Sequence, residues 1–204
     1  MNRILFSIDR FSMWVGHAFA WCILVLTFAT SYEVFVRYVL RDPTAWAFDI
    51  SYIMYGTLFM MAGAYTLSRD GHVRGDVVYR LWPPRVQAAI EFVLYLVFFF
   101  PGVLALIYAG MDYAGESWGW REASINSPAG VPVYPLKMIL PVASFVLLLQ
   151  GIAQTIRCVL CMKEGKWPQR LHDVEEMETL IRQKREQAAK ATAPEGGETG
   201  RDAT

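Results

Sequence analysis

The stretch FVLYLVFFFPGVLALIYAGM at residues 92–111 runs for twenty residues without a charged side chain. Three further uncharged stretches of similar length occupy residues 11–32, 50–68 and 138–156. A helix needs about 20 apolar residues to cross the hydrocarbon core of a bilayer. Because lipid offers no partners to backbone N–H and C=O groups, each stretch is expected to be helical, and continuous apolar runs disfavour a barrel. The sequence therefore predicts an all-α integral membrane protein with four transmembrane helices.

The predicted spans belong to a transmembrane domain of residues 1–161, and they cover about residues 11–39, 46–68, 88–112 and 136–160. Between the second and third spans, residues 76–82 lie between a glycine and a Pro-Pro pair and predict a short interfacial helix. Residues 162–204 form a soluble tail. Its segment 173–190 has acids first and bases last, which matches the macrodipole of a helix, and the composition beyond it predicts disorder.

Composition and motifs argue against several function classes. The formal net charge is zero, whereas a nucleic-acid-binding protein needs a basic face. Cys158 and Cys161 form a C-x-x-C pair without the two further nearby ligands that a zinc site needs. His17 is the only histidine within a span, so a haem held by two histidines is not expected. No catalytic motif occurs, and we expect neither a cofactor nor enzymatic activity.

The distribution of Lys and Arg predicts the orientation in the membrane. Ten of these residues lie at the N-terminus, between the second and third spans, and after the fourth span, against four on the opposite side. Positive flanks stay on the cytoplasmic side. Both termini are therefore expected in the cytoplasm, and the long connection at residues 112–137 is expected to face outward.

Three charged side chains lie near the ends of the first two spans. Glu33 and Arg37 are one helical turn apart and can pair on one face. Asp49 opens the second span, close enough to join them across the turn beside the interfacial Trp46. Glu33, Arg37, Trp46 and Asp49 thus form a predicted polar cluster. It has three readings: a structural lock of the first hairpin, an interface with another subunit, and a proton or ion path.

Spans two to four offer few other polar side chains. We expect these to be scattered on separate helices, where they cannot hold a polar substrate together. The small residues Gly56, Gly63 and Gly151 instead predict close helix packing. Such a chain is typical of an accessory subunit.

Three motifs in order resemble a known family. They are an E-x-x-x-R at residues 33–37, a W-x-x-D at residues 46–49 and an H-V-R-x-D at residues 72–76. The last belongs to a cytoplasmic-loop motif comprising Arg69, His72, Arg74 and Asp76. Together these residues resemble the small permease (DctQ-type) subunit of tripartite ATP-independent periplasmic (TRAP) transporters. The segment YPLK at residues 134–137 resembles the branch labelled for mannitol/chloroaromatic compounds or 2-oxo acids.

The resemblance implies a bacterial inner-membrane protein and two partners. One is a large permease (M-type) subunit that moves as an elevator and holds the substrate and sodium sites. The other is a periplasmic substrate-binding protein (P-type) that captures an organic acid. The small subunit would act as a scaffold without substrate or metal ligands of its own. The alternative is the membrane anchor subunit of a respiratory or redox complex.

Overall fold

The computed structural model describes residues 2–69, 79 and 81–168, which lie within one compact unit, Met1–Pro168. The first hairpin consists of α1 (Asn2–Ala20), α2 (Cys22–Phe35), the π-helical turn η1 (Val36–Leu40) and α3 (Ala47–Ser68). The second consists of α5 (Pro84–Leu94), the π-helical turn η2 (Tyr95–Phe99), α6 (Phe100–Trp120) and α7 (Tyr134–Glu164). Four segments are long and apolar enough to cross a membrane: Arg3–Leu40, Ala47–Ser68, Pro84–Trp120 and Tyr134–Glu164. The expected all-α fold is confirmed.

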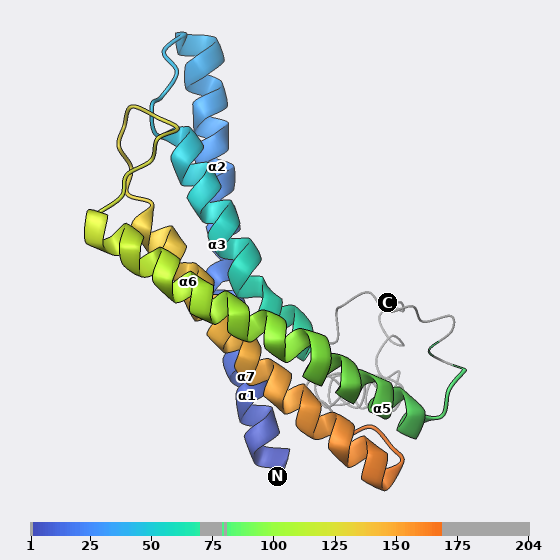
Figure 1. Cartoon of the computed structure of the whole chain (residues 1–204). Helices are drawn as coiled ribbons and strands as arrows, with labels where there is room; N and C mark the ends of the chain where they lie inside the picture. Colours follow the sequence, from blue (N-terminus) through green and yellow to red (C-terminus); the bar gives the residue numbers. More distant parts are fainter. Residues whose placement is uncertain (1, 70–78, 80, 169–204) are drawn as a thin grey trace, which may run out of the picture. The chain divides into compact units, whose positions relative to one another are not determined.

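Helix α7 is the central element of this unit. It packs against α6 and α5 within the second hairpin and against α3 and α1 of the first. Helix α2 packs mainly on α3 and contains no buried residue. Figure 1 shows the first hairpin, in blue and cyan, crossing the second, in green and orange. The half of the first hairpin formed by α2 therefore presents its apolar side chains to lipid or to a partner.

This unit has two ends. The connections 41–46 and 121–133 lie together at the end that we call the loop end. The start of α1, the end of α3, the start of α5 and the end of α7 lie at the opposite end, which we call the terminal end (Figure 1).

The helices extend beyond the uncharged stretches. The third span continues to Trp120, so the connection that follows is 121–133 rather than 112–137. Asp112 and Glu116 continue the helix because both lie on its exposed side, where their charges remain solvated. The helix ends at Arg121, which adopts a left-handed conformation with φ of 48°.

Close packing between helices depends on two glycines. A Cβ atom at Gly16 would lie 2.6 Å from the Cβ of Tyr65, so α1 and α3 approach closely there. A Cβ atom at Gly151 would lie 2.1 Å from Cε1 of Phe99. At Gly56 and Gly63 the nearest atoms would be 3.4 and 4.0 Å away, an ordinary contact. Tight packing was expected at Gly56, Gly63 and Gly151, and it occurs at Gly151 and at the unpredicted Gly16.

Several expectations fall outside the described residues. These are the tail helix at 173–190 and the motif residues His72, Arg74 and Asp76. Of the interfacial helix expected at 76–82, the structure describes only Tyr79, Leu81 and Trp82.

Candidate functional site

A buried polar cluster joins α1 to α7 near the terminal end. The ion pair between Asp9 Oδ2 and Arg157 Nη2 measures 2.5 Å, and the two side chains are 2% and 1% exposed. Gln150 Nε2 donates to Asp9 Oδ1 over 2.9 Å, and Ser12 Oγ donates to Gln150 Oε1 over 2.9 Å. Both carboxylate oxygens of Asp9 are therefore bonded, which is the condition under which a buried charge is tolerated.

The cluster also reaches α3. Arg157 Nη1 donates to Gln154 Oε1 over 3.1 Å, and Gln154 Nε2 donates to the backbone carbonyl of Leu67 over 3.1 Å. That carbonyl belongs to the last turn of α3. The cluster thus ties three helices, α1, α7 and α3, together.

The uncharged stretches do not predict this cluster, because Asp9 and Arg157 lie just outside two of them. A usable signal was the spacing of Gln150, Gln154 and Arg157 along one face of α7. The expectation that polar groups are scattered on separate helices is wrong for this set. The burial of Arg157 also removes one of the ten charges assigned to cytoplasmic flanks.

At the loop end, Glu33 and Arg37 pair as the spacing suggested. Arg37 Nε and Nη2 donate to Glu33 Oε1 over 2.9 and 2.6 Å. The other carboxylate oxygen accepts hydrogen bonds from the backbone N–H of Thr44, over 3.1 Å, and from the Thr44 hydroxyl. The ring of Trp46 stacks on that of Tyr32 with centroids 6.0 Å apart. Glu33 of α2 therefore holds the 41–46 turn against that helix.

Asp49 lies in a separate network. Its carboxylate is 1% exposed and accepts hydrogen bonds from the hydroxyls of Ser124, over 2.5 Å, and of Ser127. Asp49 lies in the first turn of α3, where the helix macrodipole favours a negative charge. The four residues expected in one cluster are therefore separated. Glu33 and Arg37 form a group with Thr44, Trp46 stacks on Tyr32, and Asp49 holds the 121–133 connection.

The 121–133 connection is itself ordered by hydrogen bonds. Ser124 N donates to Val131 O over 2.8 Å, and Val133 N donates to Glu122 O over 3.0 Å. The carboxylate of Glu122 accepts hydrogen bonds from Lys137 and, over 2.7 Å, from Ser117. The hydrogen bond from Lys137, followed by that from Ser117, lowers the pKa of Glu122. Glu122 therefore stays ionised at neutral pH.

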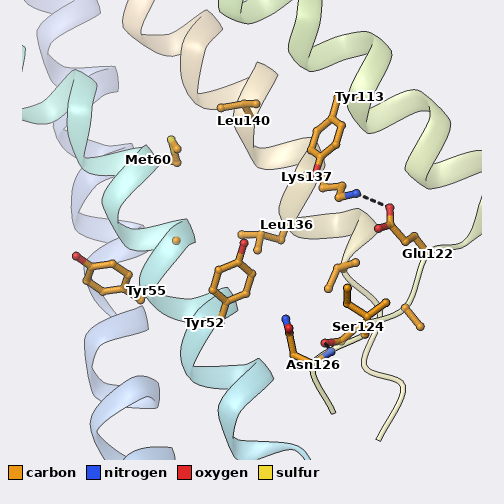
Figure 2. Close-up of a pocket in the computed structure, with 14 residues that line it drawn as sticks. Tyr52, Tyr55, Met60, Tyr113, Glu122, Ser124, Asn126, Leu136, Lys137 and Leu140 are labelled. Carbon is orange, nitrogen blue, oxygen red and sulfur yellow. Dashed lines mark hydrogen bonds and ion pairs between the residues drawn. The ribbon is translucent and has the colours of Figure 1, made fainter. Parts of the chain in front are cut away.

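A groove lies beside this connection, between α3 and α7. Its volume is about 440 Å³, and Figure 2 shows Tyr52 and Tyr55 of α3 on one side and Leu136, Lys137 and Leu140 of α7 on the other. Its lining includes both charged and apolar side chains.

The remaining candidates contribute no metal site in the described part of the chain. No group of three or more His, Cys, Asp or Glu side chains there could hold an ion. The thiols of Cys158 and Cys161 contact Glu91 Oε2 and the carbonyl of Pro84, over 3.8 and 3.5 Å. Of the cytoplasmic-loop motif, Arg69 is described, and its guanidinium lies 5.5 Å from the centroid of the Tyr65 ring.

The family model for the DctQ component of tripartite ATP-independent periplasmic transporters matches residues 26–161. The chain belongs to the DctQ family. It is the small membrane subunit of a TRAP transporter, and the family is one of transporter components rather than enzymes. No curated protein matches the chain at a significant level.

The matched residues contain two of the polar networks completely and the buried cluster only in part. The Glu33–Arg37–Thr44 group and the Asp49 group both lie inside residues 26–161. The buried cluster combines Gln150, Gln154 and Arg157 from the matched region with Asp9 and Ser12, which precede it. Asp9 and Ser12 of α1 therefore complete a polar network whose other side chains lie in the matched region.

Proposed function

We propose that this DctQ-family chain is a scaffold for a sodium-driven importer of an organic acid in the bacterial inner membrane. A large permease subunit would carry the moving parts and the substrate and sodium sites, and a periplasmic binding protein would deliver the substrate. This chain would hold the large subunit in the bilayer. The likeness of residues 134–137 to the mannitol/chloroaromatic or 2-oxo acid branch makes 2-oxo acids the first substrates to test.

The observation that supports this proposal is the internal pairing of the buried polar groups. A carboxylate substrate and a sodium ion need several converging donors and oxygens. In the described helices, Asp9, Arg157 and the two glutamines instead bond to one another and to Leu67. The hydroxyl of Thr57 and Nε of Arg157 are buried without a hydrogen bond, but one oxygen cannot coordinate sodium alone, and a guanidinium nitrogen is not a sodium ligand. This pairing is what a static support requires.

The distribution of apolar side chains supports a partner contact. On α2, Phe28 is 72% exposed, and at the loop end Tyr38 is 76% exposed. Arg37, next to Tyr38 in the sequence, has 54% of its side chain exposed, although it is within a segment long enough to span the membrane. Beyond its pair with Glu33, the exposed part of this guanidinium is available to lipid headgroups or to a carboxylate of a partner subunit.

The scaffold role predicts a requirement for this chain without a contribution to substrate affinity. We expect liposomes containing the large subunit to show sodium-dependent uptake only when this chain is present. Replacing Ser51 or Thr66 by alanine should leave the KM for the acid and the sodium stoichiometry unchanged, because their hydroxyls lie apart from any converging set. Full uptake by the large subunit alone would refute the scaffold role. A changed substrate preference in either variant would show that this chain shares the transport site.

The Glu33–Arg37 pair predicts a measurable effect on assembly. Replacing Glu33 by alanine removes both hydrogen bonds to Thr44 and should loosen the 41–46 turn. Replacing Arg37 by alanine removes the exposed charge. Both variants should pull down less of the large subunit while membrane insertion stays normal. Arg10→Ala, an exposed arginine near the terminal end, is the control and should assemble normally. If both test variants assemble normally with the large subunit, the Glu33–Arg37 pair does not contribute to the interface.

The proposed orientation can be tested with introduced cysteines. Asn126 is exposed in the 121–133 connection, and Glu164 is exposed at the end of α7. A membrane-impermeant thiol reagent applied to intact spheroplasts should label Asn126→Cys but not Glu164→Cys. Lysed cells should show labelling of both, which controls for accessibility. The reverse pattern in intact cells would place the termini outside.

A further inference from the structure

The groove at the loop end changes character along its length. Both α3 and α7 begin there, so later residues of each helix lie farther from the 121–133 connection. Near the connection the lining includes Asn126 and the charged pair Glu122 and Lys137. Farther along, it includes Met60 and Leu140 (Figure 2). The mouth thus carries a charged pair and an amide beside the apolar Ile125 and Val133, and the lining farther along is apolar. This arrangement matches an amphiphile.

The two charges at the mouth pair with each other, and 16% of the Lys137 side chain and 41% of the Glu122 side chain stay exposed. The Lys137 ammonium lies 4.1 Å from the centroid of the Tyr113 ring and pairs with Glu122 Oε2. Both side-chain hydrogen bonds of Glu122 in the described part of the chain, from Lys137 and Ser117, go to Oε2. Its Oε1 is left to accept from another donor, and 41% of the side chain is exposed. A zwitterionic headgroup offers a phosphate to Lys137 and a donor to Glu122.

A second, nearly apolar groove adjoins the first. It has a volume of about 380 Å³ and shares Tyr113 and Leu140 with the first groove. Gly102 and Ala105 of α6 also line it. Because the two grooves meet at the same residues, one molecule with a polar head and two hydrocarbon chains can occupy both.

We propose that these joined grooves bind a phospholipid with a primary-ammonium headgroup, phosphatidylethanolamine, with its phosphate at Lys137 and its ammonium at Glu122. An apolar helix of another protein would fill the lower part but leave Glu122 Oε1 without a donor. A choline headgroup has no N–H to donate to that oxygen. A glycerol headgroup lacks the positive charge. The bound lipid would seal the loop end of this subunit between its two hairpins.

The test uses the full chain purified with its large subunit in detergent and stripped of lipid. Native mass spectrometry would record binding of phosphatidylethanolamine, phosphatidylcholine and phosphatidylglycerol with identical acyl chains. We expect phosphatidylethanolamine to bind about tenfold more tightly than the other two, which corresponds to about 1.4 kcal/mol, because only its headgroup offers a charged N–H donor to Glu122. Lys137→Gln should weaken phosphatidylethanolamine binding by a similar factor, and Lys137→Arg should retain it.

A variant that fills the second groove tests where the lipid binds without changing any charge. A Cβ atom at Gly102 would meet nothing within 4 Å, and Gly102 lines the apolar groove, so Gly102→Leu should fold with its side chain in that groove. Gly115 lies on the same helix with equally open space and outside the groove lining, so Gly115→Leu is the matched control. We expect Gly102→Leu to lose the lipid and Gly115→Leu to keep it.

Three results would overturn the proposal. One is equal binding of the three lipids, and another is unchanged binding in both Lys137→Gln and Gly102→Leu. The third is release of the large subunit by Gly102→Leu with lipid binding intact, which would identify the groove as a protein interface.

Discussion

Replacing Arg157 by alanine should lower the free energy of unfolding by about 3–5 kcal/mol, the usual cost of removing one partner of a buried ion pair. The reason is the environment of Asp9, whose side chain is 2% exposed. Without the guanidinium, its carboxylate would keep, among the described residues, only the hydrogen bond from Gln150. Gln154 would lose a donor at the same time. The loss should therefore exceed that of any single exposed charge in the chain.

The measurement is the unfolding transition of the purified chain in detergent, compared between single and double variants. Asp9→Asn keeps an acceptor for Gln150 but leaves Arg157 buried and uncompensated, so it should also destabilise strongly. Asp9→Asn combined with Arg157→Gln removes both charges and should recover part of the loss, because a neutral pair leaves no uncompensated buried charge. Lys163→Gln, in the last turn of the same helix but exposed, is the control and should change little.

Two outcomes would contradict this account of the cluster. If Arg157→Ala unfolds at the same point as the unchanged protein, the arginine does not stabilise the contact between α1 and α7. If the neutral double variant is less stable than both single variants, the ion pair contributes net stability beyond compensating its own burial.

The sequence predicts the four spans because the constraint is local. A run of about 20 apolar residues without charge has few alternatives to a membrane helix, whatever the rest of the chain does. The helix ends are harder to predict, as α6 shows. Asp112 and Glu116 interrupt the apolar run, but their charges remain on the exposed side and the helix continues to Trp120.

The partners of the charged residues depend on distance in the fold rather than in the sequence. Glu33 and Arg37 are four residues apart, and helical spacing alone suggests their pairing. Asp49 is close to both in sequence, yet it accepts from Ser124 and Ser127, more than seventy residues away. Ser124 and Ser127 lie in the 121–133 connection, and no local sequence pattern predicts the path of that connection. The Asp9–Arg157 pair joins residues 148 apart in the sequence and cannot be predicted from a local pattern for the same reason.

Replacing Gly16 by alanine should destabilise the first hairpin, whereas the same change at Gly63 should not. At Gly16 the added carbon would lie 2.6 Å from Cβ of Tyr65 and 2.8 Å from its Cγ. A side-chain rotation cannot move a Cβ atom, so α1 and α3 must separate. Overpacking of this kind costs about 1–3 kcal/mol, which outweighs the gain of about 1 kcal/mol from replacing glycine by alanine in a helix.

Gly63 is the matched control, because an added carbon there would be 4.0 Å from its nearest neighbour, Leu147 Cδ1. The added methyl group makes no clash there, and alanine has the higher helix propensity. Gly63→Ala should therefore be neutral or slightly stabilising. In thermal unfolding in detergent, the transition temperature should fall for Gly16→Ala. For Gly63→Ala it should stay the same or rise slightly. Separation of the helices should also disturb the ring contact between His17 and Tyr65, whose centroids are 5.5 Å apart. Equal transitions for both variants would show that α1 and α3 do not approach closely at Gly16.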